Sequence, residues 1–94
     1  MPNNPDNAIL IGSKPLMSYV LAVVTQLGNG KKEILIKARG NAISKAVDVA
    51  ELLKNKFAPG TTIADIKTAT EQMKSHDGRD VGVSTIAILI KKPA

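Results

Sequence analysis

Hydrophobic positions follow two different periods along this chain of 94 residues and divide it into helices and strands. Between residues 16 and 27, apolar side chains recur at the spacings of one helical face: Leu16, Val20, Val23, Val24 and Leu27. A second such face follows Asn41 and consists of Ile43, Ala46, Val47, Ala50 and Leu53, with Phe57 at the helix end. Residues 8–11, 31–39, 61–73 and 81–90 are rich in aliphatic and β-branched side chains, which is typical of strands.

Turn and capping residues separate these segments. Ser13 stands ahead of the first helix as a candidate N-cap. Gly40 turns the chain after the second strand, and Asn41 is a candidate N-cap for the second helix. The dipeptide Asp77-Gly78 lies between the last two strand-like runs, which is a strong signal for a β-hairpin.

The resulting order, β-α-β-α-β-β, predicts an α/β fold of the two-layer α+β type. We expect a mixed four-stranded sheet with two helices, in which the last two strands form an antiparallel hairpin. One domain should cover residues 8–92. Residues 1–7 contain two prolines and three asparagines, and we expect them to form a flexible tail.

The polar end of the hairpin predicts an extended arm. From Thr68 to Asp80 only Ala69 and Met73 are hydrophobic, so this length of ribbon has little to pack against a core. Five or six residues per strand at about 3.4 Å each would project roughly 15–20 Å. Such a ribbon fits a nucleic-acid groove. A solvated loop explains the same residues equally well.

Composition narrows the class of function. The net charge of +5 and a pI of about 9.7 favour an anionic partner such as nucleic acid, or simply keep the protein in solution. The absence of cysteine excludes disulfides, thiolate nucleophiles and the usual zinc sites. No membrane partner is expected, because no apolar run approaches the roughly 20 residues of a membrane span.

Reactive groups are too scattered to predict an enzyme. His76 is the one histidine of the chain and falls in the predicted hairpin tip, where a solvated role is by far the commoner one. The carboxylates form no paired motif, and the segment GNGKKE lacks the spacing of a phosphate-binding P-loop. We therefore expect no catalytic residues, no metal and no cofactor.

Cations are better organised than carboxylates. Lys14 lies at the first strand-to-helix corner, Lys37 and Arg39 end the second strand, and Lys45 lies about one turn into the second helix. Parallel strands bring such corners to one edge of a sheet, where both helix N-termini favour a phosphate. The alternative is a solvated basic rim without a ligand.

Three stretches resemble the Alba family of archaeal chromatin proteins: ILIGSKPLMSYVLAV, EILIKARGNAISKAVDVAELLKNKF and DGRDVGVSTIAILI. The resemblance implies a homodimer that binds double-stranded DNA with little sequence preference, and RNA as well, in the cytoplasm and on the chromosome. It implies that the first loop and the second corner bind the DNA backbone, while the hairpins extend along the duplex. With the basic corner, the candidate nucleic-acid-binding residues are Ser13, Lys14, Lys37, Arg39, Gly40, Asn41, Lys45, Lys74 and Arg79.

Three departures from the family pattern remove cations. Ser13 stands where relatives often carry the first of two lysines, and Asn41 where they often carry arginine. At the hairpin tip, Asp77 and Asp80 offset the cations, and Gly82 occupies a position that can hold arginine. These changes predict weaker binding, or a heterodimer with a more basic paralogue.

The resemblance leaves two questions open. Phe57 is either a core plug or a contact between neighbouring dimers on DNA, and Tyr19 is expected to pack at the border of the core. The alternative function is that of an RNA-binding subunit in an RNA-processing or RNA-stabilising complex.

Overall fold

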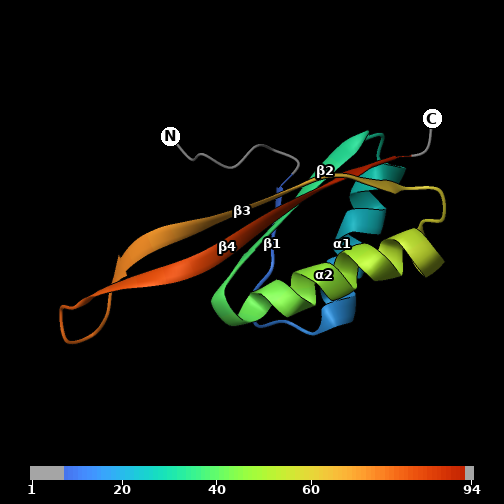
Figure 1. Ribbon diagram of the computed structural model, residues 1–94. Coiled ribbons are helices and arrows are strands. Elements are labelled where there is room, and N and C mark those ends of the chain that lie inside the picture. The colour runs from blue at the N-terminus through green and yellow to red at the C-terminus, as the bar shows by residue number, and fades with distance from the viewer. Residues whose placement is uncertain (1–7, 93–94) are drawn as a thin grey trace.

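The computed structural model describes residues 8–92 and has the predicted β-α-β-α-β-β order (Figure 1). Its elements are β1 (Ala8–Leu10), α1 (Leu16–Gly28), β2 (Glu33–Arg39), α2 (Ile43–Leu52), β3 (Thr62–Lys74) and β4 (Asp80–Lys91). A 3-10 turn, Gly40–Ala42, precedes α2, and a π-helical turn, Leu53–Phe57, continues it. The flexible tail expected over residues 1–7 lies outside the described residues.

The four strands form one mixed sheet with the order β1-β2-β4-β3. β1 pairs with β2 in parallel, whereas β4 is antiparallel to both of its neighbours. Both helices lie on the same face of this sheet, as Figure 1 shows. The predicted two-layer fold, with its mixed sheet and final hairpin, is therefore confirmed.

Side-chain alternation in the central strands produces the core. In β2, Ile34, Ile36 and Ala38 are buried against the helices, as their two-residue spacing predicted. Ile88 and Ile90 of β4 lie on the same face, because they pair directly with β2. The helices close the core with fully buried Val20, Val23, Val49 and Leu53.

The predicted apolar face of α2 was wrong at one position. Val47 is 41% exposed, and Val49 is fully buried in its place. The observed stripe consists of Ala46, Val49, Ala50 and Leu53, which is as good a helical repeat as the predicted one. Two overlapping stripes share most of their members, and only packing against the sheet decides between Val47 and Val49.

Both predicted N-caps were wrong. Helix α1 begins at Leu16 with Pro15 at the N-cap position, so Ser13 lies too far ahead to cap it. Asn41 lies inside the 3-10 turn, and Ala42 takes the N-cap position of α2. The 3-10 turn already begins at Gly40, which has a φ of +58°, so Asn41 lies within that turn and not ahead of the helix.

A two-stranded arm extends from the body (Figure 1). The pairing of β2 with β4 ends at Arg39 and Thr85, and beyond that point β4 pairs with β3 alone. We call residues 70–84 the arm. Five residue pairs at about 3.4 Å each give a length of about 17 Å before the loop Ser75–Arg79. The molecule is accordingly 47 Å long but only 27 and 19 Å across.

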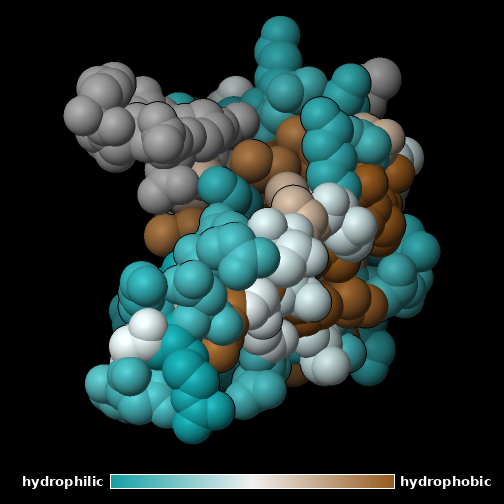
Figure 2. All heavy atoms as spheres, turned by 60° about the vertical axis from the view of Figure 1, so that its left-hand side comes forward, coloured by the Kyte–Doolittle hydropathy of each residue, from teal (hydrophilic) through white to brown (hydrophobic). Residues whose placement is uncertain are grey.

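The arm carries more apolar side chains than the composition of residues 68–80 predicts. Met73 pairs directly with Val81, and Glu71 with Val83, so three apolar side chains share one face of the ribbon. The prediction rested on the residues up to Asp80 and left out the start of β4. Such cross-strand pairs stabilise a ribbon that has no core beneath it. Figure 2, which turns the arm forward, nevertheless shows mainly hydrophilic and neutral residues at this end of the molecule.

The exposure of Phe57 favours one of its two interpretations, whereas Tyr19 differs from its expected place. Phe57 is 43% exposed, which argues against the core-plug interpretation. Tyr19 is only 8% exposed and belongs to the core rather than to its border.

Among residues 8–92, no helix has both the length and the hydrophobicity to cross a membrane.

Candidate nucleic-acid interface

Two strand-to-helix corners lie side by side at one edge of the sheet. The parallel pairing of Leu10 with Lys37 continues through a hydrogen bond of 2.8 Å from the Ile11 amide to the Lys37 carbonyl. The loop after β1, residues 11–15, therefore leaves the sheet beside the turn that follows β2. Figure 1 shows both connections on the side of the body from which the arm extends.

The second corner also adjoins the base of the arm. A side chain at Gly40 would lie 3.8 Å from a methyl group of Val83, an arm residue of β4. Arg39 pairs with Thr85, the first residue of β4 after the arm. The first corner, the second corner and the arm thus form one continuous edge of the molecule.

Ser13 and Lys14 are exposed in the first loop, whereas the half-buried Lys45 is bonded to the backbone of that loop. The Lys45 ammonium donates hydrogen bonds of 3.0 and 2.9 Å to the carbonyls of Gly12 and Lys14. The amides of the same two residues donate to the Tyr19 hydroxyl, at 2.9 and 3.0 Å. Lys45 therefore joins the predicted cluster, but its ammonium already has partners in the loop.

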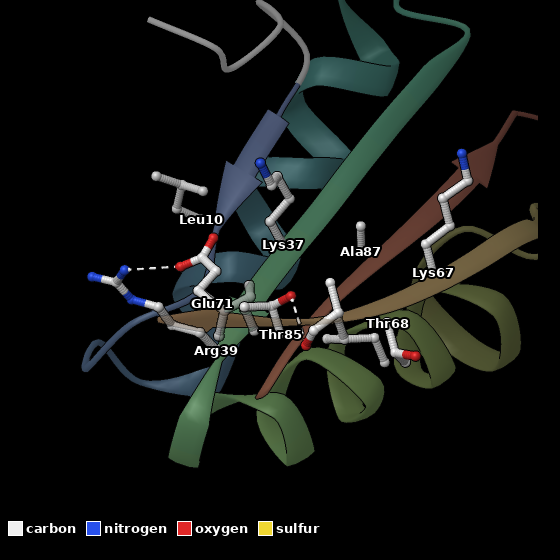
Figure 3. A pocket seen from close by; sticks show the side chains of 12 residues that line it. Leu10, Lys37, Arg39, Lys67, Thr68, Glu71, Thr85 and Ala87 are labelled. Atoms are coloured by element: carbon white, nitrogen blue, oxygen red, sulfur yellow. Dashed lines mark hydrogen bonds and ion pairs between the residues drawn. The ribbon is translucent and has the colours of Figure 1, made fainter. Parts of the chain in front are cut away.

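Lys37 and Arg39 project from the face of the sheet that the helices leave open (Figure 3). Arg39 is held by Glu71 of β3, with 3.5 Å between Nη1 and Oε1, and both side chains are more than half exposed. A shallow hollow of about 510 Å³ lies on this face. Lys67 of β3 stands across it from Lys37, with Ala87 of β4 between them.

Charges at the tip of the arm are paired with one another. Lys74 contacts Asp80 at 3.0 Å, and the Arg79 guanidinium contacts Asp77 at 2.7 Å. Hydrogen bonds from the Ser75 hydroxyl and from Arg79 lower the pKa of the Asp77 carboxyl below its ordinary value. The two cations and two carboxylates cancel, so the tip carries no net charge at neutral pH.

The structure thus divides the predicted residues into two groups. Ser13, Lys14, Lys37, Arg39, Gly40, Asn41 and Lys45 lie at the paired corners, whereas Lys74 and Arg79 lie at the far end of the arm.

Sequence reasoning missed Tyr19, Lys67 and Glu71. The two-residue alternation of β3 would have shown which face of the sheet Lys67 occupies. A bulge at Ala64 interrupts that alternation, because the pairing steps from Ile63 directly to Asp65. Glu71 is 32 residues from Arg39 in the sequence, and no local pattern connects them.

Within the part of the chain that the structure describes, no group of three histidine, cysteine or carboxylate side chains gathers at a spacing that would hold a metal ion. His76 is exposed in the arm loop, away from both corners. What the edge offers is a set of cations, which suits the binding of an anionic polymer.

The chain is similar to known proteins along nearly its whole length. The family model described as Alba matches residues 7–71. A protein of Methanocella arvoryzae named DNA/RNA-binding protein Alba is 49% identical over 88 residues, which are 94% of this chain and 92% of that protein. DNA/RNA-binding protein Alba 1 of Archaeoglobus fulgidus is also 49% identical, over 93% of this chain and 97% of the relative.

Solved structures share the fold. Alba from Thermoplasma volcanium superposes with a TM-score of 0.87 at 48% identity, covering 92% of this chain and all of that one. ALBA1 from Trypanosoma brucei has a TM-score of 0.78 at 26% identity, covering 97% of this chain and 73% of that one.

Proposed function

Because this chain belongs to the Alba family, we propose that it is an architectural protein that binds double-stranded DNA, and RNA as well, without sequence specificity. In this role it compacts or organises archaeal chromatin. The observation that carries the proposal is the continuous edge formed by the two corners and the arm. Lys14, Lys37 and Arg39 lie along it, beside a ribbon that extends well beyond the body.

Binding at this edge rests on phosphate contacts. Arginine and lysine side chains and exposed backbone amides position a duplex by its phosphates, and such contacts carry no base information. The glycine at position 40 keeps the second corner free of a side chain, so the phosphate backbone of a nucleic acid can approach closely. The arm then follows the duplex towards a groove, where Lys74 and Arg79 exchange their carboxylate partners for phosphates.

The protein acts as a dimer in this proposal. β3 is an edge strand of 13 residues, and such a long edge is usually covered in a native protein. Ile66 of this strand is 53% exposed on the helix side of the sheet, and Val47 of α2 is 41% exposed. A second copy that covers these side chains would place two arms on one duplex. The partner is the same chain or a more basic paralogue.

The role is not enzymatic, in keeping with the Alba family, which is a nucleic-acid-binding and non-catalytic one. We place the protein in the cytoplasm, in association with the chromosome. Phe57 remains a candidate contact between neighbouring dimers on DNA, because it is an exposed aromatic residue at the end of the helical segment.

A second function, that of a subunit in an RNA-processing or RNA-stabilising complex, is favoured by the relatives that are named DNA/RNA-binding proteins. Fluorescence anisotropy with matched DNA and RNA duplexes at two salt concentrations separates the two, with the oligomeric state measured alongside. Comparable, strongly salt-dependent binding of several unrelated DNA duplexes supports the architectural role. A clear preference for structured RNA over every DNA duplex supports the RNA role, and binding to neither refutes both.

A further inference from the structure

The backbone of the first loop is held by two side chains of the helices. Gly12 and Lys14 each direct their amide to the Tyr19 hydroxyl and their carbonyl to the Lys45 ammonium. Four backbone groups of one short loop are thus satisfied by two side chains, one from α1 and one from α2. All four distances lie between 2.9 and 3.0 Å, which is ordinary hydrogen-bond geometry.

The two side chains support each other. Tyr19 is buried in the first turn of α1, so the protein fixes its ring. The Lys45 ammonium lies 5.8 Å from the centre of that ring, within the range of a cation–π interaction. Tyr19 and Lys45 thus hold the backbone of the first loop together.

This arrangement changes what the loop offers to a phosphate. The Gly12 and Lys14 amides already donate inward, and two of the three Lys45 N–H groups are used on carbonyls. The Lys45 ammonium also covers carbonyl oxygens that would otherwise repel a phosphate. The groups left to bind are the exposed Ser13 and the exposed Lys14 side chain.

We infer that Tyr19 and Lys45 are positioning residues, which lock the loop Gly12–Lys14 in the conformation that presents Ser13 and Lys14 to nucleic acid. The inference rests on the proposed function. Its physical basis is preorganisation: a loop that is ordered before binding does not lose that conformational freedom when the phosphate arrives. Lys45 then contributes to nucleic-acid binding by positioning Lys14, and not by a phosphate contact of its own.

Tyr19→Phe is the cleanest test, because it removes the hydroxyl and leaves the charge unchanged. Amide hydrogen exchange of the free protein should accelerate about tenfold at Gly12 and Lys14, which lose their partner, and stay unchanged at Ile36 in the core. Affinity for a duplex should fall about three- to tenfold. In a Lys14→Ala background the same substitution should change affinity by less than about twofold, since the group that it positions is gone.

Lys45→Met provides a second route, with Lys31→Met as its control for the lost charge. Lys31 is exposed ahead of β2, at the opposite end of that strand from the second corner. Lys45→Met should accelerate exchange at Lys14 and show the same coupling to Lys14→Ala, whereas Lys31→Met should do neither.

Equal losses of affinity in the presence and absence of Lys14 would overturn the positioning role, as would unchanged exchange at Gly12 and Lys14. A wild-type protein that binds no duplex refutes the proposed function and this role together. A wild type that binds, with additive effects in the variants, refutes the positioning role alone.

Discussion

The contact between Arg39 and Glu71 predicts that one substitution strengthens nucleic-acid binding. Arg39 ends β2 at the second corner of the proposed interface, and Glu71 holds its guanidinium at 3.5 Å. A phosphate must compete with that carboxylate. Glu71→Gln removes the competing charge while keeping the size of the side chain, and should therefore raise affinity for every duplex.

The expected gain follows from the exposure of the pair. The side chains of Arg39 and Glu71 are 60% and 55% exposed, so water screens their attraction. Unit charges at this distance attract by about 1 kcal/mol in bulk water, and measured exposed pairs contribute about 0.2–1 kcal/mol. Affinity should rise by about 1.4- to 5-fold for each protomer in contact.

The assay is a duplex titration at low and moderate salt, with Asp65→Asn as the matched control. Asp65 lies on the same strand and the same face, is exposed, and carries the same charge. Six residues of strand, roughly 20 Å, separate it from Glu71. In an Arg39→Ala background Glu71→Gln should lose its advantage. Equal gains from both neutral variants, or a gain that survives Arg39→Ala, would refute the idea that Glu71 restrains this arginine.

Three further predictions test the fold and the arm. Val49→Ala should lower the free energy of unfolding by about 1–3 kcal/mol, whereas Val47→Ala should cost less than about 1 kcal/mol; equal costs in denaturant titrations would contradict the observed stripe. Phe57→Ala should leave the melting temperature nearly unchanged but reduce cooperativity of binding along DNA, and a large loss of stability would restore the core-plug interpretation. Replacing residues 73–81 with Asn-Gly should leave a folded dimer by circular dichroism and sizing, and weaken DNA binding by about 1–2 kcal/mol per arm. An unfolded product would show that the arm is structural. A folded product with undiminished affinity would show that the arm does not touch DNA.

Much of the fold could be predicted because local patterns and packing agree. In β2, Ile34, Ile36 and Ala38 share one face, while the charged residues Glu33, Lys37 and Arg39 share the other with Leu35, so the first face is left for the core. Helix α2 was less determined, because Val47 and Val49 both fit a helical stripe. The N-cap prediction failed at Asn41, because the 3-10 turn ahead of α2 already begins at Gly40.

The site was predictable only in part. The corners followed from parallel strands leading into helices, and they lie side by side as expected. The partners of the cations did not follow. Glu71 meets Arg39 only because β3 lies beside β4 and β4 beside β2, and Lys45 reaches the loop only through the packing of two helices. Such long-range contacts depend on three-dimensional positions that sequence spacing does not record.

The paired corners are proposed to hold nucleic acid by its phosphates. The most direct measurement is the salt dependence of binding to several unrelated duplexes for Arg39→Ala, beside Lys31→Ala, which removes a cation at the opposite end of β2. Arg39→Ala should weaken binding equally for all sequences and flatten the slope of log affinity against log salt by about 0.9 for each phosphate that the arginine neutralises, while Lys31→Ala should keep the wild-type slope. An Arg39→Ala protein with the affinity and slope of the wild type would contradict phosphate binding at the paired corners.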